Sequence, residues 1–285
     1  MGEGAMPARK YLTNFCNLYE TYNRREYVHP DPLEFLYRYP DIRDREIVGL
    51  IAACLAYGSV HQILKTVGVV LKNMDRPYSF LIKSSRRSLG RDFGDFKYRF
   101  TTGEELASLL LGIKAIIKAY GSLGDCFSEG FQPEHDTVVP ALAEFVSRLT
   151  VMVREGTMSL VPLPHRGSAC KRLHLYLRWM VRSDDVDPGG WSHVPRSKLV
   201  VPVDVHMHRL SLRLGLTRRK HADIKTALEI TSAFRAIEPH DPVKYDFALT
   251  RLGIRKDLCP DDFFARCADY DSVEGEDVRI TALGS

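Results

Sequence analysis

Two segments of the chain contain residues whose types and spacing can support chemistry. In the first, residues 168–182, a helical arrangement places Lys171, His174, Arg178 and Arg182 within one sector of the helix. Leucine, tyrosine and methionine side chains occupy the opposite side, so we expect one buried face and one cationic stripe. Such a stripe suits contacts with DNA phosphates, which give affinity without reading base sequence. A solvent-exposed face of an ordinary surface helix has the same pattern.

The second segment, residues 199–220, includes the run Val-Pro-Val-Asp-Val-His-Met-His-Arg. Its alternating apolar residues are typical of a strand, which would project Asp204, His206 and His208 from one face. Carboxylate and imidazole groups suit zinc and similar metals, so a metal-dependent hydrolase is one hypothesis. In the other interpretation, Asp204 follows an extended stretch as the N-cap of a helix. The histidines are then surface or core side chains.

The elements that must position these residues are predicted to be helices. Apolar residues recur at helical spacing, and N-cap residues and glycines mark several expected ends. Thr102 and Glu105, three residues apart, form the pattern of a capping box. The predicted helices are 31–39, 42–57, 59–74, 102–120, 138–153 and 220–237, with a last helix opening at Asp241-Pro242, and the predicted loops are 127–137, 156–167 and 183–197. The expected fold class is therefore all-α.

The composition is that of a water-soluble globular protein. The 285 residues are 45% hydrophobic and 27% charged, and the formal net charge of +4 permits nucleic-acid binding without requiring it. The longest apolar run, residues 47–57, is shorter than the ~20 residues that span a bilayer. The first ten residues lack the apolar region of a signal peptide. We therefore expect a cytoplasmic protein with no membrane partner.

The cysteines give no sign of a cofactor. None forms a Cys-x-x-Cys pair, whereas an iron–sulfur cluster usually takes four closely placed cysteines. We expect free thiols in a reducing compartment, no cofactor and no resident metal. The six cysteines are Cys16, Cys54, Cys126, Cys170, Cys259 and Cys267.

The run Pro-Val-Asp-Val-His-Met around Asp204 resembles a segment of 8-oxoguanine DNA glycosylases, and more distantly a Val-Asp-x-His segment of endonuclease III. Both belong to the helix-hairpin-helix (HhH-GPD) DNA glycosylase superfamily. In that superfamily the aspartate caps a helix facing the active site. It lies downstream of a hairpin whose second helix begins near a catalytic lysine. Lys171, followed by leucines at 173 and 177, matches that lysine position.

A wider resemblance covers nearly the whole chain. The run SACKRLHLYLRWMVRSDDVDPGGWS, with LAYG upstream and DPVKYDFAL downstream, resembles a bacterial family of unknown function assigned to the same superfamily. The resemblance implies a helix-hairpin-helix glycosylase fold with a cleft between two helical subdomains, residues 40–155 and residues 1–39 plus 156–285. The hairpin departs from the glycosylase pattern: residues 163–171 are two residues longer and have one glycine fewer.

The implied activity is base excision from DNA, with or without AP-lyase activity, on a damaged base such as an oxidised one. Lys171 would attack C1′ of the sugar and form a Schiff base, while Asp204 stabilises the developing charge or transfers protons. Attack requires a neutral amine. The neighbouring cations expected to favour the neutral form of the Lys171 amine lie on the same helix: Arg172, Arg178 and His174.

The resemblance also implies DNA-binding residues and a partner. The partner is double-stranded DNA with a damaged base in the bacterial nucleoid, bound by a monomer. The altered hairpin and the lack of an evident set of base-recognition residues favour an alternative, a non-catalytic nucleic-acid-binding protein that retains the fold. The expected DNA contacts are Arg166, Gly167, Arg172, Arg178 and His206, with Tyr57 and Ser59 in a wedge that fills the gap left by a flipped base.

Overall fold

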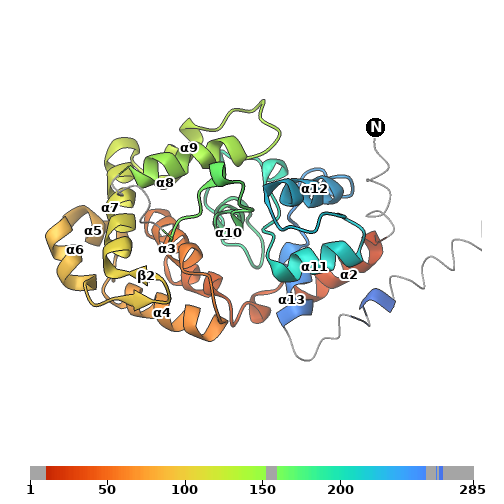
Figure 1. The fold of residues 1–285 in the computed structure, drawn as a ribbon, viewed down its shortest axis with the longest axis horizontal. Helices are drawn as coiled ribbons and strands as arrows, with labels where there is room; N and C mark the ends of the chain where they lie inside the picture. Colours follow the sequence, from red (N-terminus) through yellow and green to blue (C-terminus); the bar gives the residue numbers. More distant parts are fainter. Residues whose placement is uncertain (1–10, 152–158, 255–260, 262, 266–285) are drawn as a thin grey trace, which may run out of the picture.

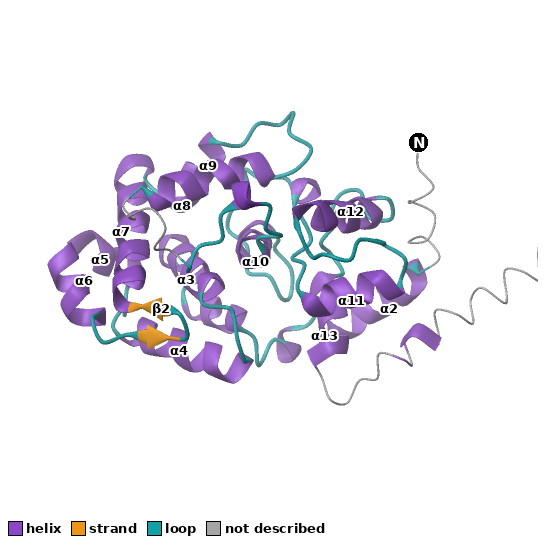
Figure 2. Ribbon diagram, in the orientation of Figure 1, coloured by secondary structure: helices purple, strands orange, loops and turns teal. Residues whose placement is uncertain are grey.

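A computed structural model describes residues 11–151, 159–254, 261 and 263–265, and every structural statement below concerns these residues. The chain is mostly helical, which confirms the prediction of an all-α fold. Two short strands, orange in Figure 2, form an antiparallel hairpin in which Lys97 pairs with Thr102 and Tyr98 with Thr101. The hairpin consists of β1 (Lys97–Tyr98) and β2 (Thr101–Thr102).

The helices follow one another along the chain, with longer connections on either side of α10. The α-helices are α2 (Leu12–Tyr22), α3 (Ile42–Cys54), α4 (Val60–Lys72), α5 (Pro77–Lys83), α6 (Arg86–Phe93), α7 (Gly103–Tyr120), α8 (Leu123–Glu129), α9 (Val139–Thr150), α10 (Lys171–Val181), α11 (Val205–Arg213), α12 (Ile224–Arg235) and α13 (Asp246–Ile254). The 3₁₀ helices are η1 (Arg25–Tyr27), η2 (Pro32–Arg38), η3 (Pro164–Arg166) and η4 (Arg196–Lys198).

Helix α10 occupies the middle of the molecule. In Figure 1, α3 to α9 lie on one side of it, and α2 and α11 to α13 lie on the other. Helix α10 packs against α3, and α13 contacts both α2 and α11. The central position of α10 connects the two groups of helices. The predicted cleft between two subdomains stays a prediction.

Sequence signals explain several helix boundaries. Thr102 accepts a hydrogen bond from the backbone N–H of Glu105, whose carboxylate accepts one from the N–H of Thr102, so the predicted capping box is confirmed. Helix α7 ends at Gly121, whose φ of 92° is accessible mainly to glycine. Residues 46–54 of α3 are buried all round because α3 packs against η2, α4, α5, α8 and α10.

The structure also differs from the predicted elements. The helix predicted over 42–57 ends at Cys54, and the last helix begins at Asp246, after a turn that follows Asp241-Pro242. Helix α8 was not predicted, and its end overlaps the predicted loop 127–137. Its seven residues are too few to show a clear helical period in the sequence. Helices α2, α5 and α6 and the β-hairpin were not predicted. Part of the predicted loop 156–167 lies outside the described residues.

Within the described ranges, no single helix is long and apolar enough to cross a membrane. Helices α7 and α8 pass such a test only as a pair, and they are bent by 70° relative to each other.

Candidate active site

Asp204 is the N-cap of α11. Its Oδ1 accepts hydrogen bonds from the backbone N–H groups of His206 and Met207, both at 2.9 Å. The helical interpretation of this segment is therefore confirmed, and the strand interpretation of the alternating apolar residues is wrong. The valines that precede Asp204 are buried but belong to no strand, so their apolar character reflects burial.

Lys171 is the first residue of α10 and lies beside Asp204. Its Nζ is 3.6 Å from Asp204 Oδ2, and each side chain retains 31% of its exposure. The residue before Lys171, Cys170, has a left-handed backbone with φ of 45°, which sets where α10 begins. The fold thus brings together the two residues that the sequence predicted to act together. Their separation is that of an ion pair and is longer than a direct hydrogen bond.

The two oxygens of Asp204 have different partners. Oδ1 is held by the cap hydrogen bonds, so the carboxylate has a fixed orientation, whereas Oδ2 faces Lys171. Next to Asp204, Val205 is 59% exposed and His206 is also exposed. Solvent therefore reaches both members of the pair.

The predicted hairpin precedes Lys171 and is exposed at its tip. Arg166 ends η3, and Gly167 follows with φ of 74°, a left-handed conformation that favours glycine. The Gly167 carbonyl accepts a hydrogen bond from the N–H of Ile224, which anchors the tip to the start of α12. Arg166 and Gly167 are exposed, as expected for DNA contacts. Residues 159–163 are not α-helical, and residues 152–158 lie outside the described part of the chain.

The predicted cationic stripe on α10 does not face solvent. His174, Arg178 and Arg182 are each 1–2% exposed. Burial lowers the pKa of His174 to about 4, so its imidazole is neutral near pH 7. Of the four residues in the stripe, only Lys171 keeps substantial exposure. The face that these residues share is therefore buried beyond Lys171, where a solvent-facing cationic stripe was predicted.

Arg178 and Arg182 belong to a buried ion-pair cluster. Arg178 Nε lies 3.2 Å from Asp187 Oδ1, and its Nη1 donates to Asp246. The predicted role of Arg178 in phosphate binding is therefore wrong, because its guanidinium is buried and paired with Asp187 and Asp246. The predicted loop 183–197 supplies Asp184 and Asp187, the Asp241-Pro242 segment supplies Asp241, and the first turn of α13 supplies Asp246. The cluster consists of Arg178, Arg182, Asp184, Asp187, Asp241 and Asp246.

Arg172 holds α10 to its neighbours. Its guanidinium donates to the backbone carbonyls of Leu160 at 3.0 Å, Ser159 at 3.1 Å and Cys54 at the end of α3. The same group lies 5.1 Å from the centre of the Tyr57 ring. The structure therefore gives Arg172 an internal role in place of the expected DNA contact.

The predicted wedge residues lie close together but differ in exposure. The Tyr57 hydroxyl donates to Thr101 Oγ1 at 2.7 Å, and its ring packs 4.8 Å from that of Tyr98. Tyr57 therefore supports the β-hairpin and is not available to enter a duplex, which corrects the prediction. Ser59 is exposed, and its side chain makes no capping hydrogen bond at the start of α4.

The histidines after Asp204 do not form a metal site. His208 is 9% exposed, and its Nε2 lies 2.8 Å from the carbonyl oxygen of Arg219, so this nitrogen donates. His206 lies on the surface of the same helix, and Asp204 is committed to the cap. No group of three or more histidine, cysteine, aspartate or glutamate side chains among the described residues can hold a metal ion. The hydrolase hypothesis based on Asp204, His206 and His208 is not supported.

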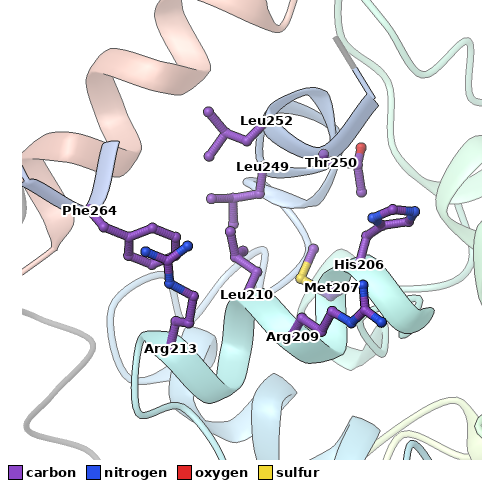
Figure 3. Close-up of a pocket in the computed structure, with 10 residues that line it drawn as sticks. His206, Met207, Arg209, Leu210, Arg213, Leu249, Thr250, Leu252 and Phe264 are labelled. Carbon is purple, nitrogen blue, oxygen red and sulfur yellow. The ribbon is translucent and has the colours of Figure 1, made fainter. Parts of the chain in front are cut away.

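A small apolar cavity of about 220 Å³ lies between α11, α13 and Phe264 (Figure 3). Methionine, leucine and phenylalanine side chains line it, together with His206, Arg209 and Arg213 of α11. Gly253 approaches His206 so closely that an added Cβ would lie 3.2 Å from its Nδ1. The cavity adjoins the helix that Asp204 caps but does not include Lys171 or Asp204.

Residues 31–255 match the family model described as "Protein of unknown function (DUF2400)", which covers well over half of the chain. The chain belongs to this family. The DUF2400 segment includes Lys171, Asp204, the exposed hairpin tip and the buried ion-pair cluster. The candidate site is thus a feature of the DUF2400 region. Neither the curated proteins nor the solved structures gave a match to the chain.

Cysteine positions in this DUF2400 protein agree with the expectation of free thiols where they are described. Cys16, Cys54, Cys126 and Cys170 are unpaired by disulfides, and burial raises the pKa of Cys54 to about 12. Cys259 and Cys267 lie outside the described residues.

Proposed function

We propose that this protein is a DNA glycosylase with AP-lyase activity, in which Lys171 is the Schiff-base nucleophile and Asp204 its proton-transfer and electrostatic partner. The observation that carries the proposal is the 3.6 Å approach of Lys171 Nζ to Asp204 Oδ2, with both side chains partly exposed. An amine and a carboxylate in this arrangement are the minimum required for nucleophilic attack at C1′ of a sugar.

The chemistry assigns a separate task to each group. Asp204 Oδ2 accepts a proton from the Lys171 ammonium, and the freed amine forms a bond to C1′ as the bond between C1′ and the base breaks. The base leaves with the electron pair and takes up a proton. The bond between C1′ and the ring oxygen O4′ then breaks as O4′ takes a proton from the new amine nitrogen, whose lone pair forms an iminium with C1′ on Lys171. The Asp204 carboxylate, having given its proton to the leaving base, removes a C2′ proton. The electron pair of that C–H bond forms a C2′–C3′ double bond as the 3′ phosphate leaves, which cleaves the strand, and water hydrolyses the Schiff base to free Lys171.

The surroundings support a DNA substrate. Arg166 and Gly167 are exposed on the hairpin that leads directly into Lys171, where a guanidinium and a backbone without a side chain can approach phosphates. The fixed cap geometry of Asp204 keeps its Oδ2 directed at Lys171 without reorganisation during the reaction. Extrusion of the target nucleotide is needed to bring C1′ to Lys171.

Borohydride trapping tests the proposal. Duplex oligonucleotides carrying 8-oxoguanine, an oxidised pyrimidine or an abasic site are incubated with the protein and borohydride, which reduces an iminium to a stable amine adduct. The proposal predicts an adduct with at least one substrate, and its loss in Lys171→Ala. Lys225→Ala is the matched control, because Lys225 is an exposed lysine in the first turn of α12.

The competing candidate is a non-catalytic nucleic-acid-binding protein of the same fold. It is favoured by the absence of an α-helix over residues 159–163 ahead of the hairpin. Duplex binding without an adduct and without base release across the panel would support that candidate and contradict the glycosylase.

A further inference from the structure

The β1–β2 hairpin presents an aromatic side chain and cations at its tip. Phe100 is 75% exposed, although phenylalanine is among the residue types most often buried. Lys97 and Arg99, on the same hairpin, are exposed as well. The Arg99 guanidinium lies 5.7 Å from the centre of the Phe100 ring. An isolated apolar side chain on a surface needs no explanation, but an exposed aromatic ring beside an exposed arginine, with an exposed lysine on the same hairpin, has the composition of a nucleic-acid contact.

The turn has an unusual backbone. Arg99 has φ of 52°, in the left-handed region that glycine or asparagine usually occupies in two-residue hairpin turns. A glycine at this position would relieve the strain but would remove the cation. Strained non-glycine residues concentrate at functional sites, where the surrounding structure holds them in place. This conformation fixes Arg99 beside Phe100 at the tip.

The hairpin is firmly attached to the end of α3. The Tyr57 hydroxyl bonds to Thr101 Oγ1 and to the Tyr98 carbonyl, and the Tyr98 hydroxyl donates to the Tyr57 carbonyl. At Gly58, an added Cβ would lie 2.9 Å from Arg99 Nη1 and 3.0 Å from Tyr98 Oη. The hairpin is thus packed closely against residues 57–58.

The same contacts connect the hairpin to the candidate active site. Tyr57 packs on the Arg172 guanidinium, and Arg172 follows Lys171 in the first turn of α10. One continuous set of contacts therefore connects the hairpin to the first turn of α10, where Lys171 lies. The residue that the sequence suggested as a wedge, Tyr57, is the support of this hairpin, and Phe100 is its exposed end.

We propose that the hairpin tip inserts Phe100 into the base stack of duplex DNA next to the target nucleotide, while Arg99 and Lys97 contact flanking phosphates. This inference rests on the proposed function for its duplex substrate. An apolar ring inserted at a base step fills the space vacated by an extruded nucleotide and holds the duplex open. The cations supply the salt-dependent part of the affinity.

Binding of a duplex with a tetrahydrofuran abasic-site analogue, compared with an intact duplex, tests this role. Stacking on a gap predicts that Phe100→Ala weakens binding of the tetrahydrofuran duplex about tenfold and binding of the intact duplex little. Phe100→Trp retains a stacking ring and should bind like the unchanged protein. Val69→Ala is the matched control, because Val69 is an exposed apolar residue (54%) on α4, and it should change neither affinity.

The phosphate contacts have a different signature. Lys97→Ala is expected to weaken binding of both duplexes equally and to reduce the slope of log affinity against log salt concentration by about one. If Lys97→Ala left the slope of log affinity against log salt concentration unchanged, Lys97 would not contact a phosphate.

A trapping comparison separates failure of this inference from failure of the proposed function. Single-stranded abasic DNA needs no opened base stack, so Phe100→Ala should form adduct on it at the normal rate and on duplex more slowly. If the unchanged protein forms no adduct but binds the tetrahydrofuran duplex through Phe100, the hairpin role stands and the lyase fails. If Phe100→Ala binds each duplex with the same affinity as the unchanged protein, the proposed role of the β1–β2 hairpin is overturned. Self-association that Phe100→Ala abolishes, measured by sedimentation velocity, overturns it in favour of a protein contact.

Discussion

Arg178 of α10 donates from Nη1 to the carboxylate of Asp246 in the first turn of α13, and both side chains are almost completely buried. Burial raises the pKa of Asp246, and the Arg178 guanidinium opposes this shift. The charges of Lys171 and Asp204 also act on Asp246, in opposite directions. The buried ion-pair cluster therefore lies close behind the candidate active site and fixes α10 relative to α13.

Removal of Arg178 is expected to destabilise the protein strongly. Arg178→Leu leaves the carboxylates of Asp187 and Asp246 buried without their main partner, which should lower the free energy of unfolding by about 3–5 kcal/mol. Urea unfolding measures this change. Arg43→Ala is the control, because it breaks a largely exposed pair with Asp41 and should change the free energy of unfolding little. A stable Arg178→Leu protein with weakened DNA affinity would instead restore the phosphate-binding role.

His174 is expected to make the protein less stable in acid. The pKa of the folded-state imidazole is lowered to about 4 by burial, from 6.5. The unfolded chain therefore takes up a proton more readily, and the stability contributed by neutral His174 is lost as pH falls from about 6.5 to about 4. His174→Leu should remove this component. Unfolding measured at pH steps across the window tests the difference in slope.

His174→Leu should retain stability near pH 7. Neither ring nitrogen of His174 has a hydrogen-bond partner among the described residues, so the substitution breaks no hydrogen bond there. A large loss of stability at pH 7 would indicate that a buried water molecule satisfies the ring.

Glu46 is expected to act in the opposite direction over the same range. Its carboxylate accepts hydrogen bonds from the N–H groups of Leu123 and Gly124 and from Trp191 Nε1, but burial still raises its pKa to about 7. The folded protein keeps this proton while the unfolded chain loses it near pH 4.5. Stability from protonated Glu46 is therefore lost as pH rises from about 4.5 to about 7.

The effect of Glu46 is best measured without that of His174. In the His174→Leu background, the free energy of unfolding should fall as pH rises through this window. Adding Glu46→Gln should flatten the dependence, even if the amide binds the three donors less well and lowers stability at every pH. A slope that is the same with and without Glu46→Gln would assign the titration to another group.

Arg166 is expected to contact phosphate without reading base sequence. Arg166→Ala should weaken binding of intact and damaged duplexes by the same factor and reduce the salt slope by about one. Fluorescence anisotropy at several salt concentrations measures both quantities. The control is Arg87→Ala on α6, an exposed arginine outside the hairpin of residues 163–171. If the two substitutions weakened binding equally, Arg166 would contribute only through the overall positive charge of the protein and not through a specific phosphate contact.

Helix N-caps could be predicted from the sequence, whereas the burial and ion-pair partners of the charged side chains could not. The Thr102 and Asp204 caps depend on side chains within three residues of the backbone they bind, so short-range patterns identify them. The exposure of Arg178 depends on Asp187 and Asp246, which come from other segments and which no periodicity on α10 reveals.

The candidate site shows the same division. The proximity of Lys171 and Asp204 was predicted from a resemblance and is present in the structure. Phe100 was missed because a two-residue strand on each side gives no alternation to detect, and exposure of one aromatic residue is decided by the tertiary packing of the hairpin.

The most direct test of the Lys171–Asp204 site is the identity of the residue that carries a borohydride-reduced adduct. The protein is reduced in the presence of abasic-site DNA, digested with nuclease and protease, and its peptides are sequenced by mass spectrometry. The proposed chemistry predicts that the sugar remnant lies on Lys171, and that Asp204→Asn slows adduct formation while leaving DNA affinity nearly unchanged. An adduct on another lysine or on the N-terminal amine, or none at all, would contradict it.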